Sequence, residues 1–477
     1  MKSNFPFKRS YVFLILFLFL SSHILGCKTL SKNTNAEKLN EIKQYIESRG
    51  EDIDVKDKKL TLDDCIALAL KNNVAIKSAE IEKKLAKLDK NIAFSSFLPQ
   101  ITASYQLVSY DRQPMVSLFG PFPVAMQDKT IRMADLQLQM PIFAPATWFI
   151  YDLRKKGVEI SDIVYDYTCQ MVALQTTLLY FQVILLENLQ KSLEQQLKSS
   201  IELKNQVQAF YDEGLLTPSQ LEKVSLLVQL KERDLNQCKY EISLAKGKLN
   251  SVLGIMPTQN ISLEHQEPIP MPEGSIEDWI LECLNDHPEI KIEEKKIEIA
   301  NDQIKLAISQ FLPLVGIFTQ WQYTSNSFNY YSQSVMNGLF GMLTVFNGFK
   351  NIEEYKKARL SREKAFLEME MKILYLIVMV LSAKTNFDKA IEDIKLAEKA
   401  LCYQKEYFRE TQEKWNEEVV TDVDLISARA DLDTAEINYL NAQIQEQIAR
   451  ALIWNALGKT YKGRSLSLVT KDAMEVK

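Results

Sequence analysis

Two pairs of short segments alternate between apolar and polar residues with a period of two, which is the pattern of half-buried β-strands. The first pair covers residues 101–107 and 134–142, and the second pair covers residues 315–323 and 339–345. The polar positions of the first pair are Thr102, Ser104, Gln106, Asp135, Gln137 and Gln139. Such hairpins fit a soluble sheet with one wet face, and they equally fit a membrane barrel wall whose polar side faces a lumen.

The segments that follow these hairpins have the helical period and are unusually long. No Gly or Pro occurs between Gly157 and Gly214 or between Gly348 and Gly458, whereas helices of soluble proteins average about three turns. In the first half the pattern predicts a helix of roughly 55–60 residues, a turn near Gly214 and a returning helix. In the second half it predicts helices over 351–417 and 422–457, with a turn near residue 418.

The chain also contains an internal duplication. Residues 61–77 (TLDDCIALALKNNVAIK) align with residues 275–291 (SIEDWILECLNDHPEIK) at an offset of 214 positions (275 − 61). Thr61 and Ser275 are predicted helix N-caps, because each is followed three positions later by an acidic residue. In each half the two shorter helices together match the length of the long helix, which predicts that they stack end to end along it.

The duplication defines the predicted organisation. From each N-cap the helix is expected to run unbroken to a Phe-Leu-Pro motif, at residues 97–99 or 311–313. The predicted segments are a first repeat over 61–253 with a strand hairpin at about 99–143, a linker over 254–274, and a second repeat over 275–457 with a strand hairpin at about 313–346.

The N-terminus has the parts of a secretory leader. A short positive segment precedes an apolar run that is too short for a membrane-spanning helix, and a small residue stands directly before Cys27. This predicts a lipoprotein signal peptide over residues 1–26 and lipidation of Cys27, although an ordinary leader with an incidental cysteine is the alternative. Residues 27–60 and 458–477 are expected to be periplasmic segments. The leader, together with aromatic residues near the strand ends, favours the membrane barrel over the soluble sheet.

Composition excludes other classes of function. The chain has 57 Lys and Arg against 62 Asp and Glu, mixed along the sequence, so no basic surface for nucleic acid is expected. The five cysteines other than Cys27 are scattered through helical patterns, which argues against a disulfide framework. The sequence has no recognisable catalytic, cofactor-binding or metal-binding motif, so we expect neither a cofactor nor an enzyme.

Several motifs resemble those of the TolC-like outer-membrane efflux protein family. In chain order they are LTLDDCIALALKNN, FLPQITASYQL, YDEGLLTPSQLEKV, DHPEIK, VFNGFKNIEEYKKA and VVTDVDLISARADLDTAEINYL. The resemblance extends over essentially the whole mature chain. The resemblance implies a mainly α fold with β, in which duplicated long α-hairpins form a periplasmic helical barrel. It also implies a trimeric, twelve-stranded transmembrane β-barrel with four strands from each subunit. One departure is Glu418, where the family usually has the glycine that Gly214 supplies in the first half.

The resemblance implies a function as well. The expected protein is a homotrimer in outer-membrane lipid that acts as the passive exit duct of a tripartite efflux or type I secretion system. A periplasmic adaptor would couple it to an inner-membrane pump. The expected adaptor-contacting tips are Gly214, Leu215, Leu216, Thr217, Val419, Val420 and Thr421. Asp424 is expected to line the tunnel aperture, with Ser427 at the place of a second acid and Asp422 as an N-cap, and the polar positions of the first strand hairpin are expected to line the barrel lumen.

Two further interpretations compete with the duct. A periplasmic adaptor, which is also often lipidated, would have one α-hairpin between Gly-rich β halves, and the duplication disfavours it. A structural coiled-coil envelope lipoprotein would need sustained heptads and no alternating strands, and the strand pattern disfavours that interpretation.

Overall fold

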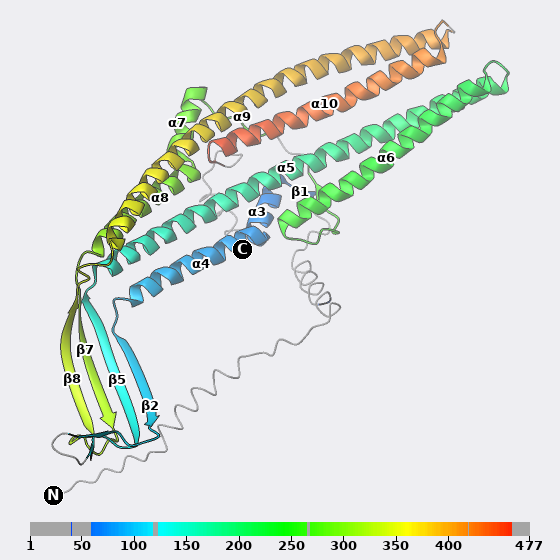
Figure 1. Cartoon of the computed structure of the whole chain (residues 1–477). Coiled ribbons are helices and arrows are strands. Elements are labelled where there is room, and N and C mark those ends of the chain that lie inside the picture. The colour runs from blue at the N-terminus through cyan, green and yellow to red at the C-terminus, as the bar shows by residue number, and fades with distance from the viewer. Residues whose placement is uncertain (1–39, 41–58, 118–122, 265–267, 418, 460–477) are drawn as a thin grey trace. The chain divides into compact units, whose positions relative to one another are not determined.

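The computed structural model describes residues 40, 59–117, 123–264, 268–417 and 419–459. The chain divides into residues 1–55 and residues 56–477, and almost all described residues belong to the second unit. Within that unit four long strands lie at one end, and the turns of two long helical hairpins lie at the other (Figure 1). The predicted leader, Cys27 and Glu418 lie outside the described residues.

Two antiparallel helical hairpins dominate the structure. They consist of α5 (Pro145–Asp212, 68 residues) with α6 (Pro218–Leu253), and of α9 (Lys350–Asn416, 67 residues) with α10 (Asp422–Ala456). Helix α5 is longer than predicted because it begins at Pro145 and continues through Gly157, next to which no other group crowds the backbone. Proline suits the first turn of a helix, where its missing N–H would have no partner.

The shorter helices are interrupted, so the prediction that they run unbroken was wrong. In the first half α3 (Leu62–Asn72) is followed by α4 (Val74–Ser95), and in the second half α7 (Ile276–Asp286) is followed by α8 (Pro288–Ser309). The breaks fall at Asn73 and His287, which are equivalent positions of the duplication. Asn73 Oδ1 accepts from the N–H of Ala75 at 2.8 Å, and His287 Nδ1 accepts from the N–H of Glu289 at 3.2 Å.

The histidine works as a cap because it is uncharged. Burial lowers the pKa of His287 below its usual value, which keeps Nδ1 unprotonated and able to accept a hydrogen bond. A glycine from the end of each returning helix packs against each break. A Cβ added at Gly254 would lie 2.7 Å from the carbonyl oxygen of Asn72, and one at Gly458 would lie 3.0 Å from Cα of His287. Both glycines also have a positive φ, of 73° and 70°, so other residues would be strained there.

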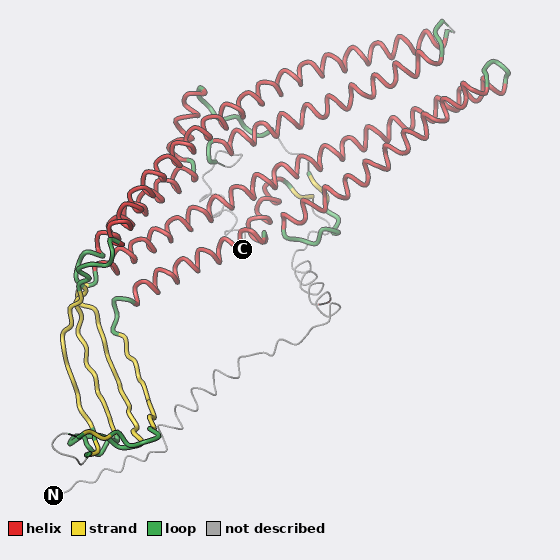
Figure 2. The backbone as a smooth tube through the Cα atoms, in the orientation of Figure 1, coloured by secondary structure: helices red, strands yellow, loops and turns green. Residues whose placement is uncertain are grey.

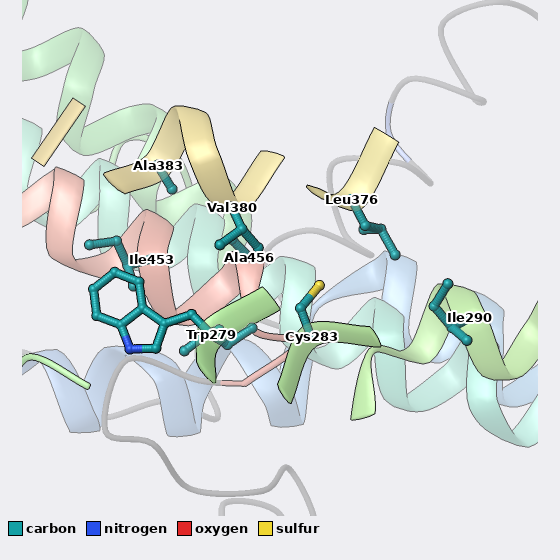
Figure 3. Packing of buried hydrophobic residues seen from close by; sticks show 9 residues of the cluster. Trp279, Cys283, Ile290, Leu376, Val380, Ala383, Ile453 and Ala456 are labelled. Carbon is teal, nitrogen blue, oxygen red and sulfur yellow. The ribbon is translucent and has the colours of Figure 1, made fainter. Parts of the chain in front are cut away.

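Each long helix is covered by three others, which is the predicted stacking. Helices α3, α4 and α6 lie along α5, and helices α7, α8 and α10 lie along α9. Figure 3 shows how the second set packs: Trp279 and Cys283 of α7 face Leu376 and Val380 of α9 and Ile453 of α10. One side of the apolar stretch at residues 371–383 of α9 therefore faces the helical core, whereas Leu374 and Val378 on its other side are exposed in the single chain.

Among the described helices, α5 is long and apolar enough in composition to cross a membrane. However, 61% of that apolar stretch is buried within the protein. Its buried side chains include Tyr180 and Phe181, whose rings meet edge to face at 5.7 Å. The stretch therefore contributes a core face of a helix that is packed on several sides.

The four long strands form one antiparallel sheet (Figure 2). They are β2 (Gln100–Ser109), β5 (Thr130–Phe143), β7 (Leu314–Thr324) and β8 (Gln333–Met342), in the order β2-β5-β7-β8. Short strands β3 (Met115–Val116) and β4 (Val124–Ala125) pair within the loop of the first hairpin, and β1 (Lys59–Leu60) pairs with β6 (Ser262–Leu263) of the linker. The outer edges of β2 and β8 have no strand partner within the described chain.

A buried carboxylate joins the two helical hairpins. Asp433 of α10 is 2% exposed, and its Oδ2 accepts from Nζ of Lys231 on α6 at 2.6 Å. Lys231 Nζ also donates to Gln196 of α5 at 3.0 Å. On the other side Nε of Arg429 lies 3.0 Å from Asp433 Oδ1, and its guanidinium stacks over Phe408 of α9. All four long helices thus meet around one acidic side chain.

We predict that Asp433→Ala destabilises the folded protein strongly. The substitution leaves Lys231 and Arg429 without their shared counter-charge in a mostly buried site, and an uncompensated buried charge costs about 3–5 kcal/mol. Asp388→Ala is the matched control, because Asp388 pairs with Lys384 on the exposed side of α9 and should lose at most about 1 kcal/mol. Chemical denaturation of the detergent-purified proteins measures both. Equal losses would show that the Asp433 cluster does not hold the hairpins together.

Candidate channel wall and helix tips

The strand register places the six predicted lumen residues on one side of the sheet, which we call the polar face. Thr102 lies opposite Gln137, and Ser104 lies opposite Asp135. The carboxylate of Asp135 accepts from Ser104 Oγ and from Gln320 Nε2, both at 3.3 Å. Cross-strand polar contacts of this kind support the sheet while leaving its surface wettable.

The opposite side, which we call the apolar face, exposes large hydrophobic side chains. They include Ile101, Tyr105 and Leu107 of β2, Leu136 of β5, and Val335 and Leu339 of β8. In a single chain Ile101 is 67% exposed and Leu339 is 69% exposed. A largely apolar surface on this scale, which Thr319 and Asn337 interrupt, marks contact with lipid or with a partner.

Aromatic side chains gather at both ends of the sheet. Where the strands meet the helices, the ring pairs are Phe94 with Tyr151 at 6.0 Å, Phe143 with Trp148 at 5.6 Å and Phe346 with Phe349 at 5.3 Å. At the loop end Tyr330 and Tyr331 stack edge to face at 4.8 Å, and Tyr330 is 91% exposed. The strands between these bands have 10–14 residues, enough for tilted strands to cross a bilayer.

Two phenylalanines also lie on the polar face, and sequence reasoning missed them. In the pairing of β7 with β8, Phe318 lies opposite Gly338 and Phe340 lies opposite Gly316. The register places these four positions on the same side as Gln320 and Gln322. The polar face is therefore polar along β2 and β5 but partly aromatic along β7 and β8.

The first hairpin tip is closed by a glycine and a threonine cap. Gly214 follows α5 with a left-handed φ of 78°, which is a common way to end a helix. Leu215 is 64% exposed at the turn. Thr217 caps α6, and its N–H and Oγ1 both donate to Gln220 Oε1 at 2.8 Å.

The second tip has the same kind of cap, which corrects one prediction. Helix α10 begins at Asp422, and its N-cap is Thr421 instead of Asp422. Thr421 accepts from the N–H of Asp424, and the N–H of Thr421 donates to Asp424 Oδ2 at 2.9 Å. Val419 is 68% exposed at this turn. Each tip thus exposes one large apolar side chain, Leu215 or Val419, beside a reciprocal capping pair.

Besides capping α10, Asp424 carries a negative charge. Hydrogen bonds from the Thr421 hydroxyl and N–H lower the pKa of its carboxyl, so the group is ionised at neutral pH. Asp424 and Ser427 are both exposed and lie three residues apart on α10, so they share a helical face. No cluster of three or more potential metal ligands occurs among the residues that the structure describes.

Solved outer-membrane channels have the same fold. The outer membrane protein VceC from Vibrio cholerae aligns with a TM-score of 0.72 at 16% identity, over 84% of this chain and 96% of that one. The CmeC outer membrane channel of Campylobacter jejuni gives 0.71 at 17% identity, over 86% and 89%. The open state of the MtrE outer membrane channel of Neisseria gonorrhoeae gives 0.68 at 17% identity, over 85% and 90%.

Comparison of the sequence with known proteins and protein families gives a match to one family. No curated protein matches the chain. The model of the outer membrane efflux protein family matches residues 279–459, from α7 through the end of α10. That stretch contains the second strand hairpin and the second helical hairpin. The match shows that residues 279–459 resemble the outer membrane efflux protein family, in line with the resemblance of the motifs.

Proposed function

We propose that the chain is one subunit of a homotrimeric channel in the outer membrane of a Gram-negative bacterium. The channel is the passive exit duct of a tripartite efflux or type I secretion system. The observation that carries the proposal is a four-stranded sheet with one apolar face, one polar face and two unpaired edges, which continues directly into two long helical hairpins.

The unpaired edges require other copies of the chain. Open edges are not tolerated in lipid, because each unpaired backbone group there costs several kcal/mol. Two copies would make eight strands, whose interior is just filled by side chains, whereas three make twelve and leave an open lumen. In that barrel the apolar face contacts lipid and the polar face contacts water.

The helices extend the barrel lumen as a tunnel through the periplasm. Helix α5, with 68 residues, is about 100 Å long at 1.5 Å per residue. Its tip lies far from the membrane, where it can meet a periplasmic adaptor that couples the duct to an inner-membrane pump. The exposed apolar residues of both tips fit such a docking role.

We predict that the purified trimer conducts ions in planar bilayers and prefers cations because of Asp424. Three carboxylates around one opening favour cations. Asp424→Gln should reduce the cation preference without loss of folding, because it copies the neutral cap of Gln220 in the first tip. Reversal potentials in asymmetric KCl measure the preference. A protein that neither forms trimers nor conducts would overturn the duct itself, and an unchanged reversal potential in the variant would overturn only the aperture assignment.

We predict that Leu215→Asp combined with Val419→Asp abolishes capture of the adaptor. The substitutions place charges on the two most exposed apolar positions of the described tips, so an apolar docking contact would be lost. Leu215→Met combined with Val419→Leu keeps the tips apolar and should preserve capture. Pull-down is read beside the mass of the trimer. Retained capture by the acidic pair would leave these residues with the role of closing the hairpins.

We predict that Cys27 is the lipidated first residue of the mature chain. The support is the apolar leader that ends in a small residue directly before Cys27. Cys27→Ser should abolish acyl labelling while the trimer still inserts through its barrel, because a single acyl chain anchors only weakly. Mass spectrometry of the mature N-terminus provides the readout, and an unmodified Cys27 there would refute lipidation.

A further inference from the structure

We propose that the polar face of the barrel carries a track for amphipathic aromatic cations, formed by Phe318, Phe340 and Asp135. The track gives the duct a class of cargo: small molecules with a flat ring system and a positive charge. The inference rests on the proposed function, since it takes the polar face as the lumen wall.

Each of the two phenylalanine rings lies close over a glycine of the neighbouring strand. A Cβ added at Gly338 would lie 2.5 Å from the ring of Phe318, and one added at Gly316 would lie 2.6 Å from the ring of Phe340. Each ring therefore covers the backbone of the glycine opposite it. The two ring centroids are 6.5 Å apart and the ring planes are tilted by 47° to each other, so the rings are direct neighbours on the polar face.

Strand pairing alone does not explain this placement. An aromatic ring over a cross-strand glycine supports a sheet, but it would do so on either face. On the apolar face the rings would gain contact with lipid, whereas on the polar face their open sides meet water at a cost that grows with apolar area. Both pairs nevertheless lie on the polar face. An apolar cargo that stacks on the rings would remove that cost.

Asp135 supplies the charge. It is the one charged side chain on the polar face of the described long strands, and only Ser104 and Gln320 bind its carboxylate, each at 3.3 Å. Along β5 it lies four residues from Gln139, which pairs with Phe318, a separation of about 13 Å along the strand. A cationic aromatic molecule thus meets the rings and then the carboxylate as it moves outward, and the rings also attract its charge through their faces.

Symmetry turns these residues into three parallel tracks. In each subunit β2 and β5 contribute mainly polar residues, whereas β7 and β8 contribute the two rings and Met336 beside the polar Gln320, Gln322 and Ser334. Around a threefold barrel, strips that contain the rings would alternate with strips that are mainly polar. An amphipathic molecule can contact both kinds of strip at once, whereas a sugar or a simple ion gains nothing from the rings.

Bilayer recordings of the full-length trimer test the track with two probes. Ethidium, a planar aromatic cation, should interrupt the K⁺ current for longer than tetrabutylammonium, an aliphatic cation of equal charge. Phe318→Ala combined with Gly338→Ala removes a ring and restores the missing Cβ. This exchange should fold, since the only groups that crowd a Cβ at Gly338 belong to Phe318. It should shorten the ethidium block about fivefold, as expected for one lost ring contact, and leave the aliphatic block unchanged.

Further variants separate the contributions. Phe340→Leu keeps an apolar cover over Gly316 and should also shorten only the ethidium block. Asp135→Asn should weaken block by both cations alike. Ile317→Ala with Leu339→Ala changes the apolar face of the same strands and should alter neither. If ethidium block is the same in wild type and in both ring variants, the rings only support the sheet and the track is refuted while the duct stands. A wild-type trimer without conductance would instead overturn the proposed function.

Discussion

Every backbone N–H and C=O group inside a bilayer needs a hydrogen-bond partner within the protein, and this constraint governs how the sheet can be placed in a membrane. The four strands satisfy one another, but the outer edges of β2 and β8 stay unpaired in the described chain. In the proposed channel the missing partners come from further copies of the same edges. There this property of the peptide group makes the sheet one third of a barrel, and it gives the two faces of the sheet opposite surroundings.

The helices obey a different constraint, because they stand in water and have to bury a core. Each half of the duplication buries apolar residues in the same way: α3, α4 and α6 pack on α5, and α7, α8 and α10 pack on α9. Where the two halves meet, the contact around Asp433 is ionic instead of apolar. A buried ion pair adds little net stability over an apolar contact. However, a slip of either hairpin would separate Asp433 from Lys231 and leave both charges buried and unpaired.

Much of this fold could be predicted from sequence because its signals are long and repeated. The offset of 214 positions located both strand hairpins, and the capping pattern located Thr61 and Ser275, whose side chains do cap α3 and α7. The breaks at Asn73 and His287 were missed, although Pro288 is a local signal for the second one, because a proline disfavours the helical conformation of the residue before it. The glycines at the ends of distant helices that pack against the breaks have no such local signal. The start of α5 was missed because Gly157 suggested a boundary where the helix continues.

The residues of the candidate site were likewise predicted only where a regular sequence pattern marks them. Alternation in β2 and β5 predicted the polar residues, because one period-two pattern describes both faces of those strands. In β7 and β8 the apolar residues occupy both faces, so the positions of Phe318 and Phe340 emerge only from the register that sets them over Gly338 and Gly316. The N-cap of α10 was misplaced by one residue, because Thr and Asp are both good caps and stand side by side at residues 421 and 422.

A comparison of the two helical tips shows that a helix cap does not require a charged partner. Thr217 is paired with Gln220 in the first tip, and Thr421 is paired with Asp424 in the second, in the same reciprocal arrangement. An acceptor oxygen at the third helical position is enough to bind the N–H of the cap residue, and the first tip provides it with a neutral amide. The charge of Asp424 therefore exceeds what the helix end needs. Because hydrogen bonds from Thr421 lower the pKa of that carboxyl, the same contacts that close the helix also keep the side chain ionised, which the proposed tunnel aperture requires.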